Sequence, residues 1–493
     1  MPRGQGELKN KILSASDPVI GDLYEKLNQH AQPFFLNKEN VTILTEPKDF
    51  YNTLKTKILN AKKRVFLCTL YVGKTEYELY EVLHKALSSN MDLKVSILMD
   101  ALRGTREAPL PTSASLLAPL ILLFGKDRVD ISMYHTPNLS GLKKKILPSR
   151  INECWGIQHM KIYGFDDEVM LSGANLSYEY FVNRQDRYHF FSSPQLTDFY
   201  AKIYQFISSI SYKLVPSNSP EKVTLVWSKE TKCPEPSKDP ENFRKYATSV
   251  LLNLLKPMPT NVDEVFSTVV YPLFQFSSIF KPYDLSTEKK CLCLVLDTLF
   301  SEKSLNYDWV FTSGYFNTHQ DYSRRLLASN SKGCVIVPSQ QANGFYNSSW
   351  PSKMIPSAYS FLAQRFLSNV YKANKQNKIH LEEWKNGCVG QGGWSYHAKG
   401  LWIMPSEEKK TENLRAYVTF VGSSNFSYRS QSLDLENTAV VITFDSNLQK
   451  SLRDEVKHLR KYSRKIDIDS FSSIDRRTGW FVKLCVWILE KML

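Results

Sequence analysis

The chain lacks any run of about twenty apolar residues, the length that a helix needs to cross a bilayer. Residues 1–7 contain neither the apolar core of a secretory signal nor the Arg- and Ser-rich pattern of an organelle presequence. We therefore expect a globular protein without a membrane-spanning helix.

The eight cysteines include no CxxC pair and no spacing typical of metal ligands. Cys291 and Cys293 are too close for a disulfide framework, and their alternation favours two thiols on one face of a strand. We expect all eight cysteines to be reduced and mostly buried, as in an intracellular protein or the interior of a reducing organelle. The sequence predicts no metal site.

The balance of charge is unusual, although the composition is otherwise ordinary. The 493 residues are 42% hydrophobic and 23% charged, enough to bury a large two-lobed core or two domains. The net charge of +14 favours a polyanionic partner. By charge alone, nucleic acid and an anionic membrane surface fit equally well.

Of the nine histidines, only His159 and His397 are followed two residues later by a lysine, Lys161 and Lys399. This repeated His-x-Lys triplet suits a reaction at phosphorus. One imidazole can attack, the other can protonate the leaving oxygen, and the ammonium groups can hold the negative oxygens. A single such triplet has little weight, because a basic chain of this length contains about one by chance.

The stronger indication of function is a repeat in the sequence around the two triplets. The segments 175–178 and 425–428 match in residue type at every position. An acid stands eleven residues beyond the asparagine that opens each segment: Asp186 and Glu436. Each copy also has an upstream tyrosine at the end of a predicted strand: Tyr71 and Tyr315. The chain is therefore predicted to contain two diverged copies of one α/β unit, each with half of a site.

Apolar patterns predict alternating strands and helices around these motifs. In the first copy they indicate strands at 65–72, 93–98 and 129–134 and a helix at 76–87. Such alternation of strands and helices favours a mixed or parallel sheet with helices on its faces. The composition of residues 232–240 is typical of a linker, which divides the chain into lobes 1–232 and 233–478.

Residues 479–493 form a third segment, predicted as an amphipathic helix. Its apolar residues are Trp480, Phe481, Leu484, Trp487, Ile488 and Leu489. Two interpretations stay open: a helix docked on the core, or an interfacial helix on an anionic membrane. The basic stretch 452–465 favours the membrane.

The pattern His159-x-Lys161-x4-Asp166, with Asn175 trailing it, resembles the signature of the phospholipase D superfamily. Shorter segments over most of the chain resemble eukaryotic phosphatidylglycerophosphate synthases: 70–73, 100–104, 183–187, 311–317, 342–345 and 397–402. The resemblance implies two phospholipase D-like lobes, each a mixed sheet flanked by helices, with the active site at the lobe interface.

This resemblance also implies an activity. The family transfers a phosphatidyl group from CDP-diacylglycerol to glycerol 3-phosphate and releases CMP, in phosphatidylglycerol and cardiolipin synthesis. The implied partners are these two substrates and an anionic membrane surface, with no nucleic acid, no cofactor and no metal. The implied location is peripheral, on the matrix face of the inner mitochondrial membrane.

The family mechanism assigns roles to the repeat. His159 attacks and forms a phosphatidyl-histidine, while His397 protonates the leaving oxygen and then deprotonates the glycerol hydroxyl; the reverse assignment stays open. The remaining candidates bind equatorial oxygens (Lys161, Lys399, Asn175, Asn425), fix an imidazole tautomer (Glu436, Asp186) or bind a substrate phosphate (Arg103). For Arg103, a structural salt bridge is an open alternative.

The second copy departs from the signature, because Met404 stands where the first has Asp166. Asp166, a catalytic candidate by the family signature, can also serve as a turn-former that accepts backbone N–H groups. Three rival functions remain: a phosphodiesterase of the tyrosyl-DNA phosphodiesterase type, a hydrolytic phospholipase D, and an inactive lipid-binding scaffold.

Overall fold

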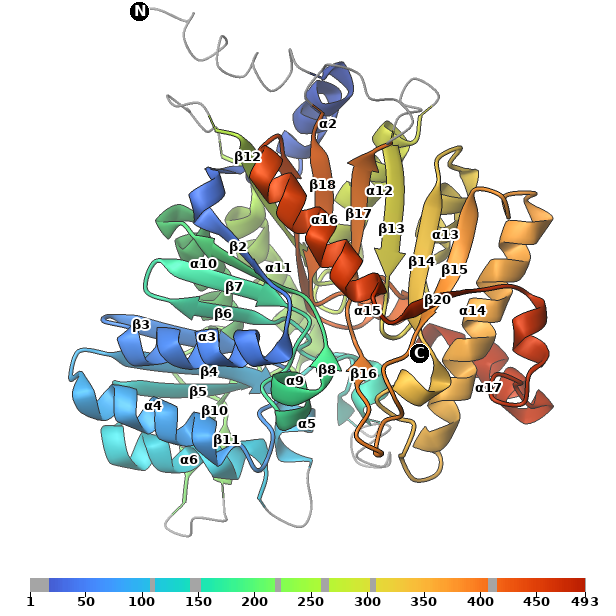
Figure 1. The fold of residues 1–493 in the computed structure, drawn as a ribbon. Coiled ribbons are helices and arrows are strands. Elements are labelled where there is room, and N and C mark those ends of the chain that lie inside the picture. The colour runs from blue at the N-terminus through green and yellow to red at the C-terminus, as the bar shows by residue number, and fades with distance from the viewer. Residues whose placement is uncertain are drawn as a thin grey trace, which may run out of the picture.

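The computed structural model describes residues 17–106, 111–141, 152–217, 223–258, 266–301, 307–406 and 415–492. It contains two large mixed sheets, each flanked by helices (Figure 1). The predicted α/β architecture with two lobes is confirmed.

The first sheet has nine strands. Their order is β11 (Val223–Val226), β10 (Tyr212–Pro216), β5 (Val129–Tyr134), β4 (Lys94–Asp100), β3 (Arg64–Cys68), β6 (Ile162–Phe165), β7 (Glu168–Ser172), β9 (Tyr188–Ser192) and β2 (Val41–Leu44). β3, β4 and β5 are parallel neighbours, and the other pairs are antiparallel.

The second sheet also has nine strands. Their order is β1 (Phe34–Leu36), β12 (Thr268–Gln275), β19 (Glu436–Thr443), β18 (Tyr417–Gly422), β17 (Gly400–Pro405), β13 (Tyr307–Thr312), β14 (Gly333–Pro338), β15 (Ile379–Trp384) and β20 (Ser463–Ile466). β13, β14 and β15 are parallel neighbours. The run from β5 to β9 therefore has the same order and directions as the run from β15 to β19, as the repeat predicted.

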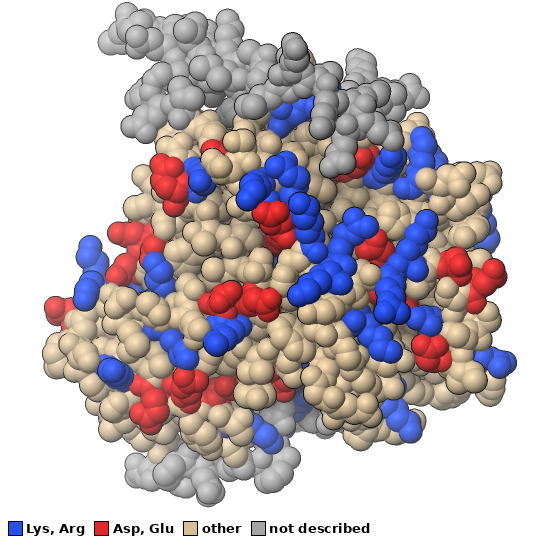
Figure 2. Space-filling model, viewed as in Figure 1, with Lys and Arg blue, Asp and Glu red and all other residues tan. Residues whose placement is uncertain are grey.

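Helices cover the faces of both sheets (Figure 1). Those of the first half are α3 (Pro47–Asn60), α4 (Tyr77–Ser89), α5 (Ala101–Thr105), α6 (Ser113–Phe124), α9 (Tyr178–Val182) and α10 (Pro194–Ser209). Those of the second half are α11 (Pro240–Leu255), α12 (Thr287–Leu299), α13 (Gln320–Ala328), α14 (Ile355–Lys372), α15 (Tyr428–Ser432), α16 (Ser446–Arg460) and α17 (Trp480–Leu489). On the face drawn in Figure 2, Lys and Arg side chains gather over α16 and β20.

The first described helix and strand belong with the second sheet, although they open the chain. β1 pairs antiparallel with β12, and α2 (Pro18–Asn28) buries Leu23 and Leu27 in the apolar core that covers one face of that sheet. The predicted boundaries at residues 232 and 478 stay predictions.

The two sheets share a core. Ile162 and Leu171 of the first sheet lie in one apolar cluster with Val421 and Val441 of the second. A two-stranded parallel sheet also crosses the interface, with β8 (Arg184–Gln185) from the first half and β16 (Ser395–Tyr396) from the second. Burial on both sides fixes the relative position of the lobes.

Several local predictions can be compared with the structure. The strand expected for Cys291 and Cys293 is wrong: both lie in α12, where an apolar face meets the core every three to four residues. All eight cysteines are free, as predicted. None of the described helices is long and apolar enough to span a membrane. Residues 1–16 lie outside the described part of the chain.

Candidate active site

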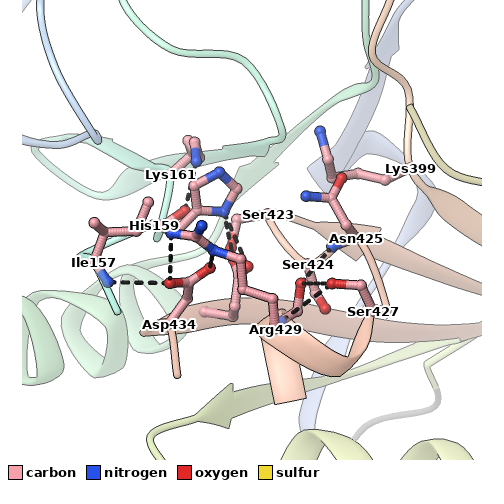
Figure 3. Close-up of polar contacts among 12 residues, drawn as sticks. Ile157, His159, Lys161, Lys399, Ser423, Ser424, Asn425, Ser427, Arg429 and Asp434 are labelled. Atoms are coloured by element: carbon pink, nitrogen blue, oxygen red, sulfur yellow. Dashed lines mark hydrogen bonds and ion pairs between the residues drawn. The ribbon is translucent and has the colours of Figure 1, made fainter. Parts of the chain in front are cut away.

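The two triplets occupy equivalent places in the two lobes. His159 to Lys161 leads directly into β6, and His397 to Lys399 leads directly into β17. All four side chains are buried at the lobe interface. Figure 3 shows His159 and Lys161 from one lobe beside Lys399 from the other. The sequence prediction that the triplets converge agrees with this geometry.

Backbone hydrogen bonds between the lobes hold the triplets. The His397 N–H donates to the Gln185 carbonyl at 2.8 Å, next to the β8–β16 pairing. The His159 N–H donates to the Leu435 carbonyl at 2.9 Å, next to a parallel bridge between Gln158 and Leu435. Each triplet is therefore attached to the segment of the other lobe that precedes the repeat's acid.

The acids are exchanged between the lobes. Nδ1 of His159 lies 2.9 Å from Oε1 of Glu436, and Nδ1 of His397 lies 2.6 Å from Oδ2 of Asp186. A carboxylate that accepts from Nδ1–H fixes the tautomer and leaves Nε2 for phosphorus. The Ser423 hydroxyl donates to Glu436 and holds it in place.

The two imidazoles share one electrostatic environment. Burial lowers the pKa of His159 and of His397 well below the usual range. The charges of Lys161 and Lys399 lower both pKa values further, each lysine acting on both histidines. Neutral imidazoles are therefore favoured at neutral pH, which is the form that a nucleophile or a general base needs.

The carboxylates shift in the opposite direction. Burial raises the pKa of Glu436 to about 7 and raises that of Asp186, while the lysines of both lobes lower them. A buried carboxylate close to its pKa can take up part of the positive charge that an imidazole gains on reaction. Both pairs are suited to an imidazole that becomes cationic in the transition state.

Each lysine folds back onto its own triplet. Nζ of Lys161 donates to the His159 carbonyl at 2.7 Å, and Nζ of Lys399 donates to the His397 carbonyl at 2.7 Å. Lys399 also lies 3.5 Å from Oδ2 of Asp186. Two ammonium groups on either side of one site can neutralise the equatorial oxygens of a phosphoryl group.

We expect oxyanion binding to be accompanied by proton uptake. Burial lowers the pKa of Lys161 to about 7, with Glu436 opposing the shift and Lys399 adding to it. At about pH 8 this amine is mostly neutral, and a bound anion raises its pKa, so a proton enters. Titration with tungstate in buffers of different ionisation enthalpy should show this uptake.

Lys161→Met should lose much of the uptake, whereas Lys213→Met should keep it, because Lys213 pairs with Asp130 elsewhere in the first lobe. Binding without any proton uptake in the wild-type protein would contradict the lowered pKa.

The two asparagines of the repeat lie beside the histidines. Nδ2 of Asn175 donates to the Tyr180 hydroxyl at 3.0 Å, and that hydroxyl lies 3.4 Å from Nε2 of His397. The side-chain oxygen of Asn425 is buried and has no hydrogen-bond partner among the described residues. The role of both amides in binding the oxygens of a phosphoryl group stays a prediction.

Two other candidates contact residues outside the triplets. Asp166 forms the turn after β6, where its carboxylate accepts from the backbone N–H groups of Lys62, Lys63 and Arg64 at 2.7 to 3.0 Å. Asp166 also has a positive φ of 49°. The structure does not bring Asp166 to the histidines, and its catalytic role stays a prediction. Arg103 lies in α5, stacked over the Tyr71 ring at 4.6 Å.

For Asp166→Asn we expect a stability loss of about 1–2 kcal/mol with little change in turnover, because an amide oxygen accepts these N–H bonds less well than a carboxylate. Urea unfolding and transfer rate, compared with Asp167→Asn in the same turn, measure both effects. A large loss of turnover in a folded Asp166→Asn protein would restore the catalytic role.

The sequence assigned no role to several residues of this site, although Tyr315 belongs to the repeat. Tyr180 and Tyr315 each place a ring edge-on against His397, at centroid distances of 5.2 and 5.3 Å. Arg184 and Asp434 precede the exchanged acids by two residues. Aligning the two copies position by position could have found this last pair, because both residues stand nine positions after the repeat asparagine.

One group of potential metal ligands lies outside this site. Donor atoms of Cys334, His380 and Glu382 lie within 4.8 Å of one another on β14 and β15. Arg460 donates to both carboxylate oxygens of Glu382, at 3.1 and 2.5 Å. Burial raises the pKa of this carboxylate, but His380 and Arg460 outweigh burial and hold the pKa at about 2, so the group is explained as an ion pair.

Similar proteins are known over the whole chain, although no family model matches it. CDP-diacylglycerol–glycerol-3-phosphate 3-phosphatidyltransferase of Saccharomyces cerevisiae is 41% identical over 98% of this chain and 94% of its own. The protein of that name from Saccharomyces pastorianus is 40% identical over 100% and 96%. The Gallus gallus protein, named mitochondrial, is 32% identical over 93% and 84%.

A solved structure supports the fold. Phosphatidylserine synthase of Haemophilus influenzae covers 96% of this chain and 99% of its own with a TM-score of 0.71, at 20% identity. The likeness confirms the two-lobed phospholipase D-like architecture. With full-length relatives above 30% identity, the chain belongs to the CDP-diacylglycerol–glycerol-3-phosphate 3-phosphatidyltransferase family.

Proposed function

We propose that the protein transfers a phosphatidyl group from CDP-diacylglycerol to glycerol 3-phosphate, giving phosphatidylglycerophosphate and CMP. One observation supports this proposal most strongly: each histidine contacts a carboxylate of the opposite lobe, and two buried lysines belong to the same site. Relatives of the chain are named for this transferase activity. Phosphatidylglycerophosphate is a precursor of phosphatidylglycerol and cardiolipin.

In the first half of the reaction, Nε2 of His159 attacks the phosphorus on the diacylglycerol side. A P–N bond forms, the P–O bond to CMP breaks, and His397 gives a proton to the leaving phosphate oxygen. The negative substrate favours the protonated His397 that this step needs. Lys161 and Lys399 hold the equatorial oxygens, and Glu436 accepts from Nδ1–H of His159 as its ring becomes positive.

In the second half, neutral His397 removes the proton from a hydroxyl of glycerol 3-phosphate. The resulting oxygen forms a P–O bond, and the electron pair of the P–N bond returns to His159. Asn175 and Asn425 supply further donors to the phosphoryl oxygens. Both residues of each histidine–carboxylate pair end as they began, so the cycle is closed.

Purified protein with CDP-diacylglycerol and labelled glycerol 3-phosphate tests this proposal. We expect equimolar phosphatidylglycerophosphate and CMP. Phosphatidic acid formed at the same rate with and without glycerol 3-phosphate would indicate a hydrolytic phospholipase D. Cleavage of a 3′-tyrosyl oligonucleotide without lipid product would indicate the phosphodiesterase.

We further propose that the protein works as a peripheral protein on the matrix face of the inner mitochondrial membrane. Vertebrate relatives are named mitochondrial. α17 packs on α14 through Val486 but leaves Trp480, Trp487 and Ile488 exposed, at 77, 78 and 63%. Such a surface suits a lipid headgroup region, and exposed cations on α16 and β20 suit acidic lipids.

Changing Trp480, Trp487 and Ile488 together to serine should weaken binding to cardiolipin-containing vesicles at least tenfold, because each removes apolar area from the interface. Vesicle flotation measures the binding, and turnover of a short-chain soluble donor should change little. Met91→Ser, at a 76% exposed position in the first lobe, is the matched control. Unchanged flotation of the triple variant would rule out α17 as the docking surface.

A further inference from the structure

The two halves of the site carry opposite charges at one equivalent position. Arg184 stands nine residues after Asn175, and Asp434 stands nine residues after Asn425. Each lies two residues before the acid that contacts a histidine. The histidine–lysine machinery is repeated, but its surroundings are not, so the two histidines face different environments.

On the His159 side the acid is already neutralised. Oδ1 of Asp434 accepts from the Ile157 N–H at 3.0 Å, and Nε of Arg429 donates to its Oδ2 at 2.9 Å (Figure 3). Arg429 also donates to the Glu153 carbonyl at 2.8 Å. Among the described residues on this side, the charge of Arg429 is therefore paired with that of Asp434.

On the His397 side the cation is available. Nε of Arg184 donates to the Ser395 hydroxyl at 2.9 Å, and the guanidinium stacks over the Tyr180 ring at 4.6 Å. Among the described residues, its two terminal nitrogens donate no hydrogen bond. Burial lowers the pKa of this group, but Tyr180, Tyr315 and Tyr71, and to a smaller extent Glu179, raise it above its usual value. Glu179 itself accepts from Ser177. A partly buried fork of N–H donors is a typical phosphate ligand.

A glycine lies close to the guanidinium of Arg184. A Cβ on Gly344 would lie 3.0 Å from Nη2 of Arg184 and 3.5 Å from the Tyr315 hydroxyl, so a glycine keeps this approach open. Tyr315 stacks edge-on against His397. Burial raises the pKa of the Tyr315 hydroxyl, and the charges of Arg184 and Arg103 both lower it, so both guanidinium groups act on a ring that contacts His397.

We propose that Arg184, assisted by Arg103, forms a subsite on the His397 side for a phosphomonoester group, distinct from the phosphoryl group that is transferred. The inference rests on the proposed function. The leaving CMP and the acceptor glycerol 3-phosphate both carry a phosphate, and an in-line displacement places the leaving and entering groups on the side opposite the nucleophile. CMP and glycerol 3-phosphate therefore occupy this side of the site one after the other.

The subsite also separates the roles of the histidines. The group that protonates the leaving oxygen and deprotonates the acceptor must lie on the side that binds both phosphates. That group is His397, which leaves His159 as the nucleophile. The repeat alone could not make this distinction, because both triplets have the same residue pattern and the same place in their lobes.

Arg184→Gln tests the subsite, because it removes the charge and keeps a donor for Ser395. We expect the KM for glycerol 3-phosphate and the inhibition constant for CMP to rise at least roughly tenfold, the scale of one charge-assisted hydrogen bond. The kcat/KM for glycerol, which lacks the phosphate, should change by less than about threefold. Arg184→Lys should recover part of the loss, and Gly344→Ala should shift both constants the same way.

The control is Arg453→Gln, which removes another arginine stacked over a tyrosine, Tyr417, at 5.4 Å on α16. An unchanged KM in folded Arg184→Gln, an unchanged CMP constant, or an equal loss with both acceptors would each overturn the subsite. Equal loss would make Arg184 a support for the β8–β16 pairing. Failure of the proposed function itself looks different, since the wild-type protein would then make no phosphatidylglycerophosphate.

Discussion

His159→Ala and His397→Ala should each lower the rate of phosphatidyl transfer by about 10⁴-fold or more, the scale seen when one member of a coupled nucleophile–base set is removed. Both imidazoles are buried, share the charges of two lysines and contact a carboxylate of the opposite lobe. Among the described residues, no other histidine hydrogen-bonds to Glu436 or Asp186. The measurement is the initial rate of CMP release and of lipid product.

The two variants should differ in what they accumulate. In His397→Ala the attacking group is intact, so labelled diacylglycerol phosphate should remain covalently attached to the protein after a neutral quench. In His159→Ala no such adduct should form. An adduct only in His159→Ala would reverse the two roles.

His84→Ala, on α4 away from the triplets, should keep wild-type activity and serves as the control. A near-normal rate in either triplet variant would end the two-histidine mechanism, whatever the adduct experiment showed. Circular dichroism and thermal unfolding should show that all three proteins are folded.

Glu455→Gln should cause the largest loss of stability, about 3–5 kcal/mol, because it leaves a buried arginine without its counter-charge. Nε and Nη2 of Arg187 donate to the two oxygens of Glu455, both at 2.9 Å, and Nε1 of Trp402 donates to the same carboxylate at 2.9 Å. The guanidinium also stacks over the Trp402 ring at 3.8 Å. Since Arg187 comes from the first lobe and Glu455 from the second, the pair holds the lobes together.

Urea unfolding measures this loss, with Glu382→Gln as the control, because Glu382 pairs with the more exposed Arg460 near the edge of the second sheet. Replacing both partners, as Arg187→Met with Glu455→Leu, should cost much less than either single change. An equal cost for the double and single variants would mean that packing, and not charge, governs this site.

The same pair has a defined pH dependence. Burial alone raises the pKa of Glu455, but Arg187 and His189 outweigh it and hold the pKa well below its usual range. The pair therefore stabilises the fold above the ordinary glutamate pKa of about 4.3 and loses that stability as the pH falls. The difference between the wild-type protein and Glu455→Gln should shrink in acid.

Much of this molecule could be predicted because its chemistry is local and doubled. His159 with Lys161, and the asparagines at fixed spacing, are short-range patterns that two copies make significant. The helix expected at 76–87 is also a local pattern, and α4 confirms it. Cys291 and Cys293 show the limit, because a short apolar run with alternation suits either a strand or a helix until its packing is known.

The remaining features depend on contacts between distant residues. No spacing indicates that Asp186 serves the second triplet and Glu436 the first, since either acid could serve its own copy. The pairing of β1 with β12 has the same origin. Arg184 and Asp434 could not be predicted from the likeness between the two copies, because they occupy a position at which the copies differ.

The exchange of acids between lobes makes each half incomplete on its own. A single copy would contain an imidazole without the carboxylate that orients it. It could obtain that carboxylate only by forming a dimer with a second copy. Joining both copies in one polypeptide guarantees that meeting at any protein concentration. It also releases the copies from being identical, which is how one side can hold Arg184 and the other Asp434, and how a symmetric pair of histidines can divide one reaction into two unequal tasks.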